Sequence, residues 1–183
     1  MTLHHHIINS DRHNVIKQHR NVISATGGTT LRSTASNTDF DEEAFLGFQL
    51  EQERYAMPIE LIGEILRIPP VTVVPRAAPT IMGIVGVRGR VLTVVDLRGR
   101  LGLSSPAPTR QARILVLPWS DHDSVGLYVD SVIEVHRFSP KDIEPAAAGF
   151  GRDQVDHVGG IARVDDHLVL ILRLDPFLEL IAK

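Results

Sequence analysis

The sequence predicts an all-β fold, arranged as a barrel or a sandwich. Two observations support this prediction. Short runs rich in Val, Ile and Leu recur along most of the chain, and turns rich in Gly, Pro and charged residues separate them. No long segment carries the apolar stripe of an amphipathic helix. Many short strands with short connections are typical of small barrels and sandwiches.

The first predicted element is a hairpin. Leu46, Phe48 and Leu50 alternate with small or polar residues, which is the period of a half-buried strand. Residues 51–54 form a polar turn, and residues 55–59 return as the natural partner strand.

The next segments are also short. Residues 61–66 suit either a helical turn or a strand, and Pro69-Pro70 ends whatever precedes it. Residues 71–74 are β-branched throughout and predict a strand that stops at Pro75. Further strands are predicted at residues 84–85, 91–95, 114–117, 125–129, 132–135, 161–164 and 168–172. The loop 104–109 is a candidate boundary between two barrels, and residues 176–181 predict a short terminal helix.

The chain divides into a tail and a core. Five of the nine histidines lie in the first 19 residues, and residues 24–39 have the composition of a flexible linker. We therefore predict a polar, histidine-containing tail over residues 1–42 and a folded domain over 43–180. Val15-Ile16 and Val22-Ile23 share one face of a hypothetical short helix, so both a docking peptide and a solvated extension remain open.

Composition excludes several classes of protein. Nineteen Lys and Arg against 22 Asp and Glu give a formal charge of −3, which provides no general attraction for nucleic acid or anionic lipid. The absence of cysteine excludes disulfides and thiolate metal sites. With no signal-peptide pattern and no apolar run near the ~20 residues of a membrane span, we expect a soluble cytoplasmic protein without membrane insertion.

The sequence offers no recognisable catalytic, cofactor or metal constellation. Gly83, Gly86 and Gly89 lead into a strand rather than a helix, so they are interpreted as turn and bulge glycines and not as a phosphate loop. The histidines match no metal-ligand spacing, and no serine lies in a nucleophile elbow. We expect no enzyme activity, no metal and no cofactor.

Four arginines surround one apolar strand: Arg88, Arg90, Arg98 and Arg100 flank residues 91–95, with Asp96 between them. In one interpretation Asp96 pairs locally with an arginine and the others are solvated. In the other, the arginines form a recognition surface, because arginine is enriched at interface hot spots. The residues alone leave both open.

The run Gly83–Gly102, GIVGVRGRVLTVVDLRGRLG, resembles the signature of CheW-like domains. Four further segments resemble family motifs in the same order, namely residues 45–59, 62–65, 126–132 and 143–145. The resemblance covers about residues 43–180. It departs from the family pattern at Gly86, Thr93 and Arg173, where the family usually has Asn, Pro and Asp.

The resemblance implies two small five-stranded, SH3-like barrels that share an apolar core, with short helices at connections and at the C-terminus. It also implies a non-catalytic adaptor that couples methyl-accepting chemoreceptors to a CheA-type histidine kinase, in the cytoplasm at membrane-associated receptor arrays. Its expected partners are the kinase regulatory domain, the receptor tip and other CheW-like domains. The positions carried over for partner binding are Glu64, Ile65, Arg88 and Gly89, with Arg90 and Arg98 at the rim.

Two alternatives differ in function. The same scaffold suits an accessory chemosensory pathway, in pilus motility or gene regulation. A small barrel also suits a nucleic-acid binder, but that role needs exposed aromatic residues and a basic face. Six Phe, two Tyr and one Trp, mostly in apolar strand contexts, make this alternative remote.

We predict that deleting residues 1–40 leaves the domain folded, because the predicted tail contributes no strand to it. The measurement is the melting temperature of the shortened chain beside that of the full chain. A large fall in melting temperature would show that the tail is part of the fold.

Overall fold

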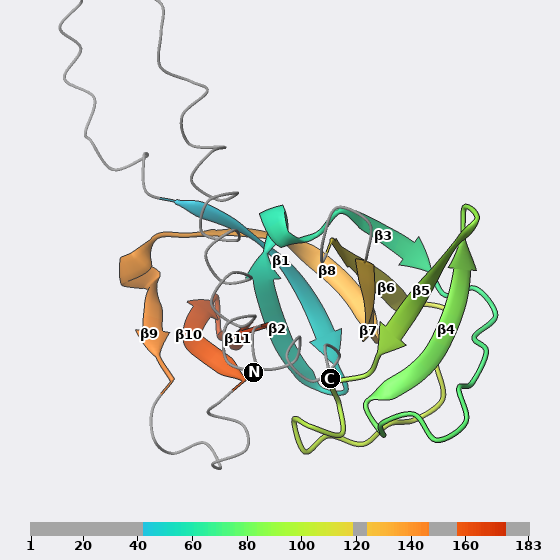
Figure 1. The fold of residues 1–183 in the computed structure, drawn as a ribbon. Helices are drawn as coiled ribbons and strands as arrows, with labels where there is room; N and C mark the ends of the chain where they lie inside the picture. Colours follow the sequence, from blue (N-terminus) through green and yellow to red (C-terminus); the bar gives the residue numbers. More distant parts are fainter. Residues whose placement is uncertain (1–41, 119–123, 147–156, 175–183) are drawn as a thin grey trace, which may run out of the picture. The chain divides into compact units, whose positions relative to one another are not determined.

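The computed structural model describes residues 42–118, 124–146 and 157–174, which form two sheets (Figure 1). The six-stranded sheet has the order β8 (Ser131–Phe138), β1 (Glu43–Leu50), β2 (Glu53–Pro58), β11 (His167–Leu172), β10 (Val158–Val164), β9 (Ile143–Pro145). The five-stranded sheet has the order β3 (Glu64–Arg67), β6 (Arg113–Pro118), β7 (Ser124–Val129), β5 (Arg90–Val95), β4 (Ile81–Val87). Two single-turn 3₁₀ helices, η1 (Ile59–Leu61) and η2 (Pro140–Asp142), lie at connections.

Each sheet consists of antiparallel strand pairs that are joined by one parallel pairing. β11 runs parallel to β2, which attaches the β10–β11 hairpin to the β1–β2 hairpin. β5 runs parallel to β7, which attaches the β4–β5 hairpin to the β6–β7 pair. The all-β prediction with two β units is confirmed, and the short strand β9 makes the first sheet six-stranded rather than five-stranded.

Two local predictions are wrong. Residues 71–74 form no strand, and only Thr72 bridges to Ile84. Prolines at 69, 70 and 75 interrupt the backbone donors that a longer ladder would need. The loop 104–109 does not separate the two units, because β5 before it and β6 after it belong to the same sheet. The chain changes sheets at η1 and between β7 and β8 instead.

Residues 61–66 contain both elements that the sequence left open, the end of η1 and then β3. The predicted tail and the predicted helix at 176–181 lie outside the described residues. Within the described ranges, no helix is long and apolar enough to cross a bilayer.

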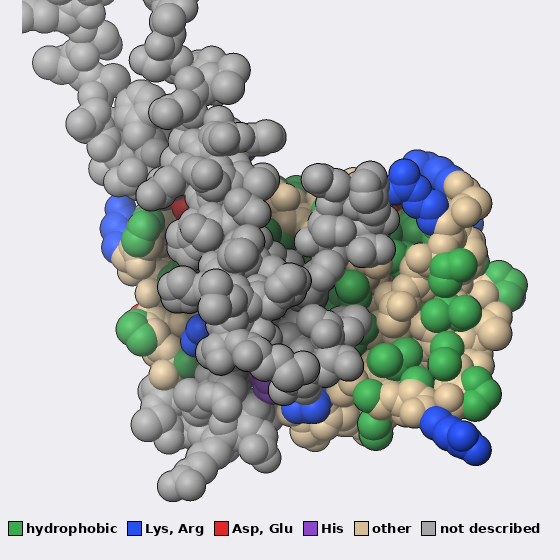
Figure 2. Space-filling view, viewed as in Figure 1, with side chains coloured by type: hydrophobic (Ala, Val, Ile, Leu, Met, Phe, Trp, Pro, Cys, Tyr) green, Lys and Arg blue, Asp and Glu red, His purple; other side chains and the backbone are tan. Residues whose placement is uncertain are grey.

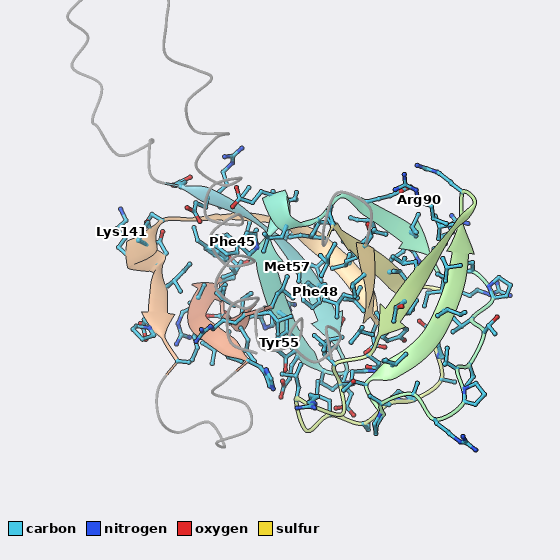
Figure 3. The ribbon with its side chains drawn as sticks, viewed as in Figure 1. Phe45, Phe48, Tyr55, Met57, Arg90 and Lys141 are labelled. Carbon is cyan, nitrogen blue, oxygen red and sulfur yellow. The ribbon has the colours of Figure 1, made fainter. Side chains whose placement is uncertain are left out.

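An apolar core lies between the sheets and draws residues from both, as the family resemblance implied. Leu46, Phe48 and Leu50 of β1 point into this shared core, whereas Phe45 packs in a second cluster on the other face of the sheet. Figure 3 shows Phe48, Tyr55 and Met57 along β1 and β2. The shared core consists of Leu46, Phe48, Leu50, Tyr55, Met57, Val95, Leu97, Leu101, Leu115, Leu117, Val125, Leu127, Val129, Leu172 and Leu174. Full burial of each large apolar side chain stabilises the fold by about 1.5–3 kcal/mol.

A third apolar cluster fills the inner side of the five-stranded sheet, and Gly126 of β7 is packed against it. A Cβ on Gly126 would lie 2.6 Å from Ile114 Cγ2 and 3.0 Å from Leu92 Cδ2, and both residues are buried. Ile114 is β-branched and cannot swing away without disturbing its neighbours. The side chains of Ile114 and Leu92 therefore pack directly over the backbone of Gly126 and leave no room for a Cβ.

We predict that Gly126→Ala lowers the free energy of unfolding by about 1–3 kcal/mol through overpacking. The matched control is Gly86→Ala on β4, where a Cβ meets nothing within 4 Å. Denaturant unfolding of both variants measures the difference. Equal stability of the two variants would contradict the packing that the structure shows at Gly126.

Candidate functional site

The turn between β4 and β5 has a tight two-residue form. Arg88 and Gly89 both have positive φ angles, 49° and 78°, as type I′ hairpin turns require. Glycine adopts this conformation freely, whereas an arginine in it carries a steric cost. The turn therefore holds Arg88 at a defined place, with its side chain 79% exposed. Gly83 is the other glycine under constraint, at a bulge where a Cβ would meet Thr72 O at 2.5 Å.

Arg88 forms an ion pair that crosses the sheet. Its Nη2 donates to Glu64 Oε1 at 2.7 Å, and Glu64 is the first residue of β3. β3 and β4 are the two edge strands of the five-stranded sheet, so the pair connects its opposite edges. The sheet must curl like a barrel to bring them together. An exposed pair of this kind contributes only about 0–1 kcal/mol to stability, so stability alone does not explain its presence.

Apolar side chains lie on the outer face of the same sheet, which is the face that packs in the shared core. Cα partners across four strands form one row, consisting of Ile65, Leu115, Leu127 and Val95. Directly opposite residues share a face, and the last three are buried in the shared core. Ile65, on the edge strand, is 44% exposed. Val91 lies on this face four residues before Val95 and is 72% exposed.

The predicted residues Glu64, Ile65, Arg88 and Gly89 thus belong to β3 and to the β4–β5 turn, which the ion pair links. Arg90 is exposed and opposes Val87 at the base of the turn. Figure 3 shows Arg90 at the tip of this hairpin, and Figure 2 shows basic side chains at that end and hydrophobic side chains along the sheet. The sequence did not identify Val91. Alternation places Val91 and Val95 on the same face of the strand, but it does not show that the six-stranded sheet covers Val95 and leaves Val91 exposed. We call Glu64, Ile65, Arg88, Gly89, Arg90 and Val91 the hairpin surface.

Arg98 does not belong to the hairpin surface, so the prediction that it lies at a rim is wrong. The residue is only 1% exposed. Its Nε and Nη2 donate to the two carboxylate oxygens of Asp96, at 3.0 and 2.8 Å, and its Nη1 donates to Asp130 Oδ1 at 2.9 Å. The guanidinium carbon also lies 4.2 Å from the centroid of the Tyr128 ring. Local pairing of Asp96 with an arginine, part of the first interpretation of the sequence, is confirmed. The other part, that the remaining arginines are only solvated, does not hold for Arg88, which pairs with Glu64.

These four residues, Arg98, Asp96, Asp130 and Tyr128, form what we call the Arg98 cluster. Asp130 Oδ2 accepts a hydrogen bond from the backbone N–H of Glu51 at 2.7 Å, and Asp130 N–H donates to the carbonyl of Gln49 at 2.9 Å. Both acceptor and donor belong to the β1–β2 hairpin of the six-stranded sheet. The Arg98 cluster therefore joins the two sheets through one carboxylate.

The surroundings of the Arg98 cluster raise the pKa values of Arg98 and Tyr128. Burial by itself would lower the pKa of Arg98, but the hydrogen bond and charge of Asp96 raise it above the ordinary value, with help from Asp130. Burial raises the pKa of Tyr128, and its hydrogen bond to Asp130 Oδ1 at 2.8 Å raises it further. Arg98 therefore stays charged, and the Tyr128 hydroxyl stays protonated as a donor.

Metal-ligating residues do not gather in the part of the chain that the structure describes, where no group of three or more His, Cys, Asp or Glu side chains could hold an ion. His122 and the tail histidines lie outside the described residues. His136 stacks on Phe138, with 5.6 Å between the ring centroids.

Comparison with known proteins identifies the family. The family model described as CheW-like domain matches residues 44–182. The chain belongs to the CheW-like domain family. It is 32% identical to the chemotaxis protein CheW of Helicobacter pylori over 149 residues, which cover 80% of this chain and 89% of that protein. It is 29% identical to the chemotaxis protein CheW of Rhizobium meliloti over 133 residues, 71% of this chain and 83% of that one.

A solved structure agrees with this assignment. The scaffolding protein TtCheW from Thermoanaerobacter tengcongensis superimposes with a TM-score of 0.67 at 27% identity. The match covers 80% of this chain and 93% of that one. The CheW-like domain of this chain therefore has the fold that the sequence resemblance implied.

We predict that Arg98→Met lowers the free energy of unfolding of this CheW-like domain by about 3–5 kcal/mol, because it leaves the partly buried Asp96 and Asp130 without their counter-charge. Arg100→Met is the matched control: Arg100 is exposed, and surface substitutions usually change stability by less than about 0.5 kcal/mol. Urea unfolding measures both. Similar midpoints for the two variants would contradict the account of the cluster.

Proposed function

We propose that this CheW-like domain is a non-catalytic adaptor that couples methyl-accepting chemoreceptors to a CheA-type histidine kinase. It acts in the cytoplasm, recruited to membrane-associated receptor arrays. Its similarity to two proteins named chemotaxis protein CheW and to a scaffolding protein supports this role. The observation that carries the proposal is the hairpin surface, in which an exposed arginine–glutamate pair lies on the same sheet as two exposed aliphatic side chains.

The chemistry of the hairpin surface suits a helical partner. A receptor tip built as a helical hairpin presents apolar ridges with polar flanks, and such helices dock their apolar face on exposed apolar side chains. Ile65 and Val91 provide this apolar contact. Arg88 provides a planar donor with five N–H groups, and within the described ranges only its Nη2 forms a hydrogen bond, to Glu64. The remaining donors are available to a carboxylate or carbonyl of the partner.

The regulatory domain of the kinase is the second proposed partner. By the family resemblance it has the same fold as this domain, so contact between like barrels is the expected mode of association. The adaptor then needs two separate surfaces, one for the receptor and one for the kinase. We assign the hairpin surface to the receptor, and binding of the kinase alone is expected to survive substitutions there.

We predict that Arg88→Ala weakens receptor-dependent control of kinase activity about tenfold, equivalent to about 1.4 kcal/mol of binding, without unfolding the domain. The measurement is kinase activity reconstituted with a receptor fragment across a titration of the adaptor. Arg163→Ala is the matched control, since Arg163 is an exposed arginine on β10 of the other sheet. The melting temperature should stay within a few degrees, because the Arg88 pair is exposed.

Two outcomes would count against the proposal. If Arg88→Ala couples as well as the unsubstituted domain, the hairpin surface is not the receptor site. If Arg88→Ala abolishes the melting transition, Arg88 has a structural role instead.

The double variant Glu64→Arg/Arg88→Glu separates the structural role of Arg88 from its role in binding, because it can restore the ion pair while it exchanges the two charges presented to the partner. We expect that variant to be folded and defective in coupling.

A further inference from the structure

A hollow lined with positive charge lies at the far end of β3. It has a volume of about 400 Å³ and is lined by Arg67, Ile68, Thr109, Arg110, Ala112 and Arg113. Three of these six residues are arginines, and none is acidic. Arg67 is the last residue of β3, whereas Glu64 of the hairpin surface is the first.

The strand register forces two of these positive charges together. Arg67 and Arg113 are direct cross-strand partners in the β3–β6 ladder, so their side chains start on the same face of the sheet. Like charges directly opposite one another destabilise a sheet. Ion pairs between described residues involve Arg88 and Arg98, and no carboxylate of the described ranges pairs with Arg67, Arg110 or Arg113. The repulsion is therefore left without a compensating protein anion in this part of the chain.

The turn that carries Arg110 is well ordered by hydrogen bonds. Gln111 N–H donates to Thr109 Oγ1, and Ala112 N–H donates to the Thr109 carbonyl, each at 3.2 Å. Arg113 Nη1 donates to the carbonyls of Arg110, Gln111 and Ala112, at 3.0, 2.9 and 2.8 Å. The Arg113 side chain thus stabilises the turn formed by residues 109–112. Among the described residues, Arg67 and Arg110, both exposed, have no such internal contact, and their guanidinium groups are available to bind a ligand.

We propose that this hollow binds the phosphate group of a small organic phosphate. Guanidinium groups recognise phosphate oxygens in a bidentate way. Two available guanidiniums, those of Arg67 and Arg110, together with the nearby positive charge of Arg113, match a dianion better than a single carboxylate. A volume of about 400 Å³ lies within the range of small-molecule sites and exceeds what a lone phosphate ion fills. Ile68 and Ala112 provide an apolar wall for the organic part of the ligand. This site is separate from the hairpin surface and goes beyond the adaptor role.

The test is a titration of the full chain with phenyl phosphate at constant ionic strength, followed by NMR. The signals observed are the Arg Nε–Hε groups and the Ile68 methyl groups. We expect saturable shifts, with affinity about tenfold weaker in Arg67→Gln and in Arg110→Gln. Arg163→Gln, with the same change of charge on the other sheet, should bind as the unsubstituted chain does. Unchanged melting temperatures in the absence of ligand would show that the exposed-arginine variants are folded.

Parallel titrations with inorganic phosphate and with benzoate separate the parts of the proposal. Both should bind more weakly than phenyl phosphate, because one lacks the apolar part and the other lacks the second negative charge. Shifts that do not saturate, or that sodium chloride reproduces, would overturn the site. If Arg163→Gln weakens phenyl phosphate binding as much as Arg67→Gln does, the binding is general electrostatic attraction and the proposed site is overturned. If inorganic phosphate binds as tightly as phenyl phosphate, the apolar wall does not contribute. If benzoate binds as tightly as phenyl phosphate, the hollow has no preference for phosphate.

Discussion

One buried guanidinium, that of Arg98, is linked through Asp130 to residues of both sheets. Arg98 holds Asp96, directly after β5, and Asp130, directly after β7, and Asp130 in turn receives the backbone N–H of Glu51 from the other sheet. Bringing these charges out of water costs several kcal/mol per ion, which their mutual attraction and hydrogen bonds offset. The shared apolar core supplies the favourable free energy of folding. We infer that the Arg98 cluster contributes chiefly by allowing only one arrangement of the sheets.

The same strand connects this buried cluster with the exposed hairpin surface. β5 ends beside Asp96 in the interior and begins at Arg90 and Val91 in solvent. Its outer face is covered at Val95 by the six-stranded sheet and uncovered at Val91. The tip of the β4–β5 hairpin therefore lies beyond the contact between the sheets. The hairpin surface thus extends from a strand whose other end is packed in the shared core.

Sequence patterns predicted those features that depend on residues close together in the chain. The β1–β2 and β10–β11 hairpins follow from alternation and from short polar turns, and the β4–β5 turn follows from Arg88-Gly89. The burial of Arg98 does not follow from its neighbours, because its second acidic partner lies 32 residues away. The loop 104–109 was misassigned for a related reason. Only the parallel pairing of β5 with β7 places both of its flanking strands in one sheet, and short-range patterns carry no information on parallel pairing.

We propose that partner recognition occurs at the uncovered end of the five-stranded sheet, at the hairpin surface. The most direct measurement is an NMR titration of the isotope-labelled full chain with a fragment of the receptor tip. The account predicts the largest shift changes at Ile65, at the Arg88-Gly89 turn and at Val91, with little change on β10 and β11. Shift changes concentrated on the six-stranded sheet, with the β4–β5 hairpin unaffected, would contradict it.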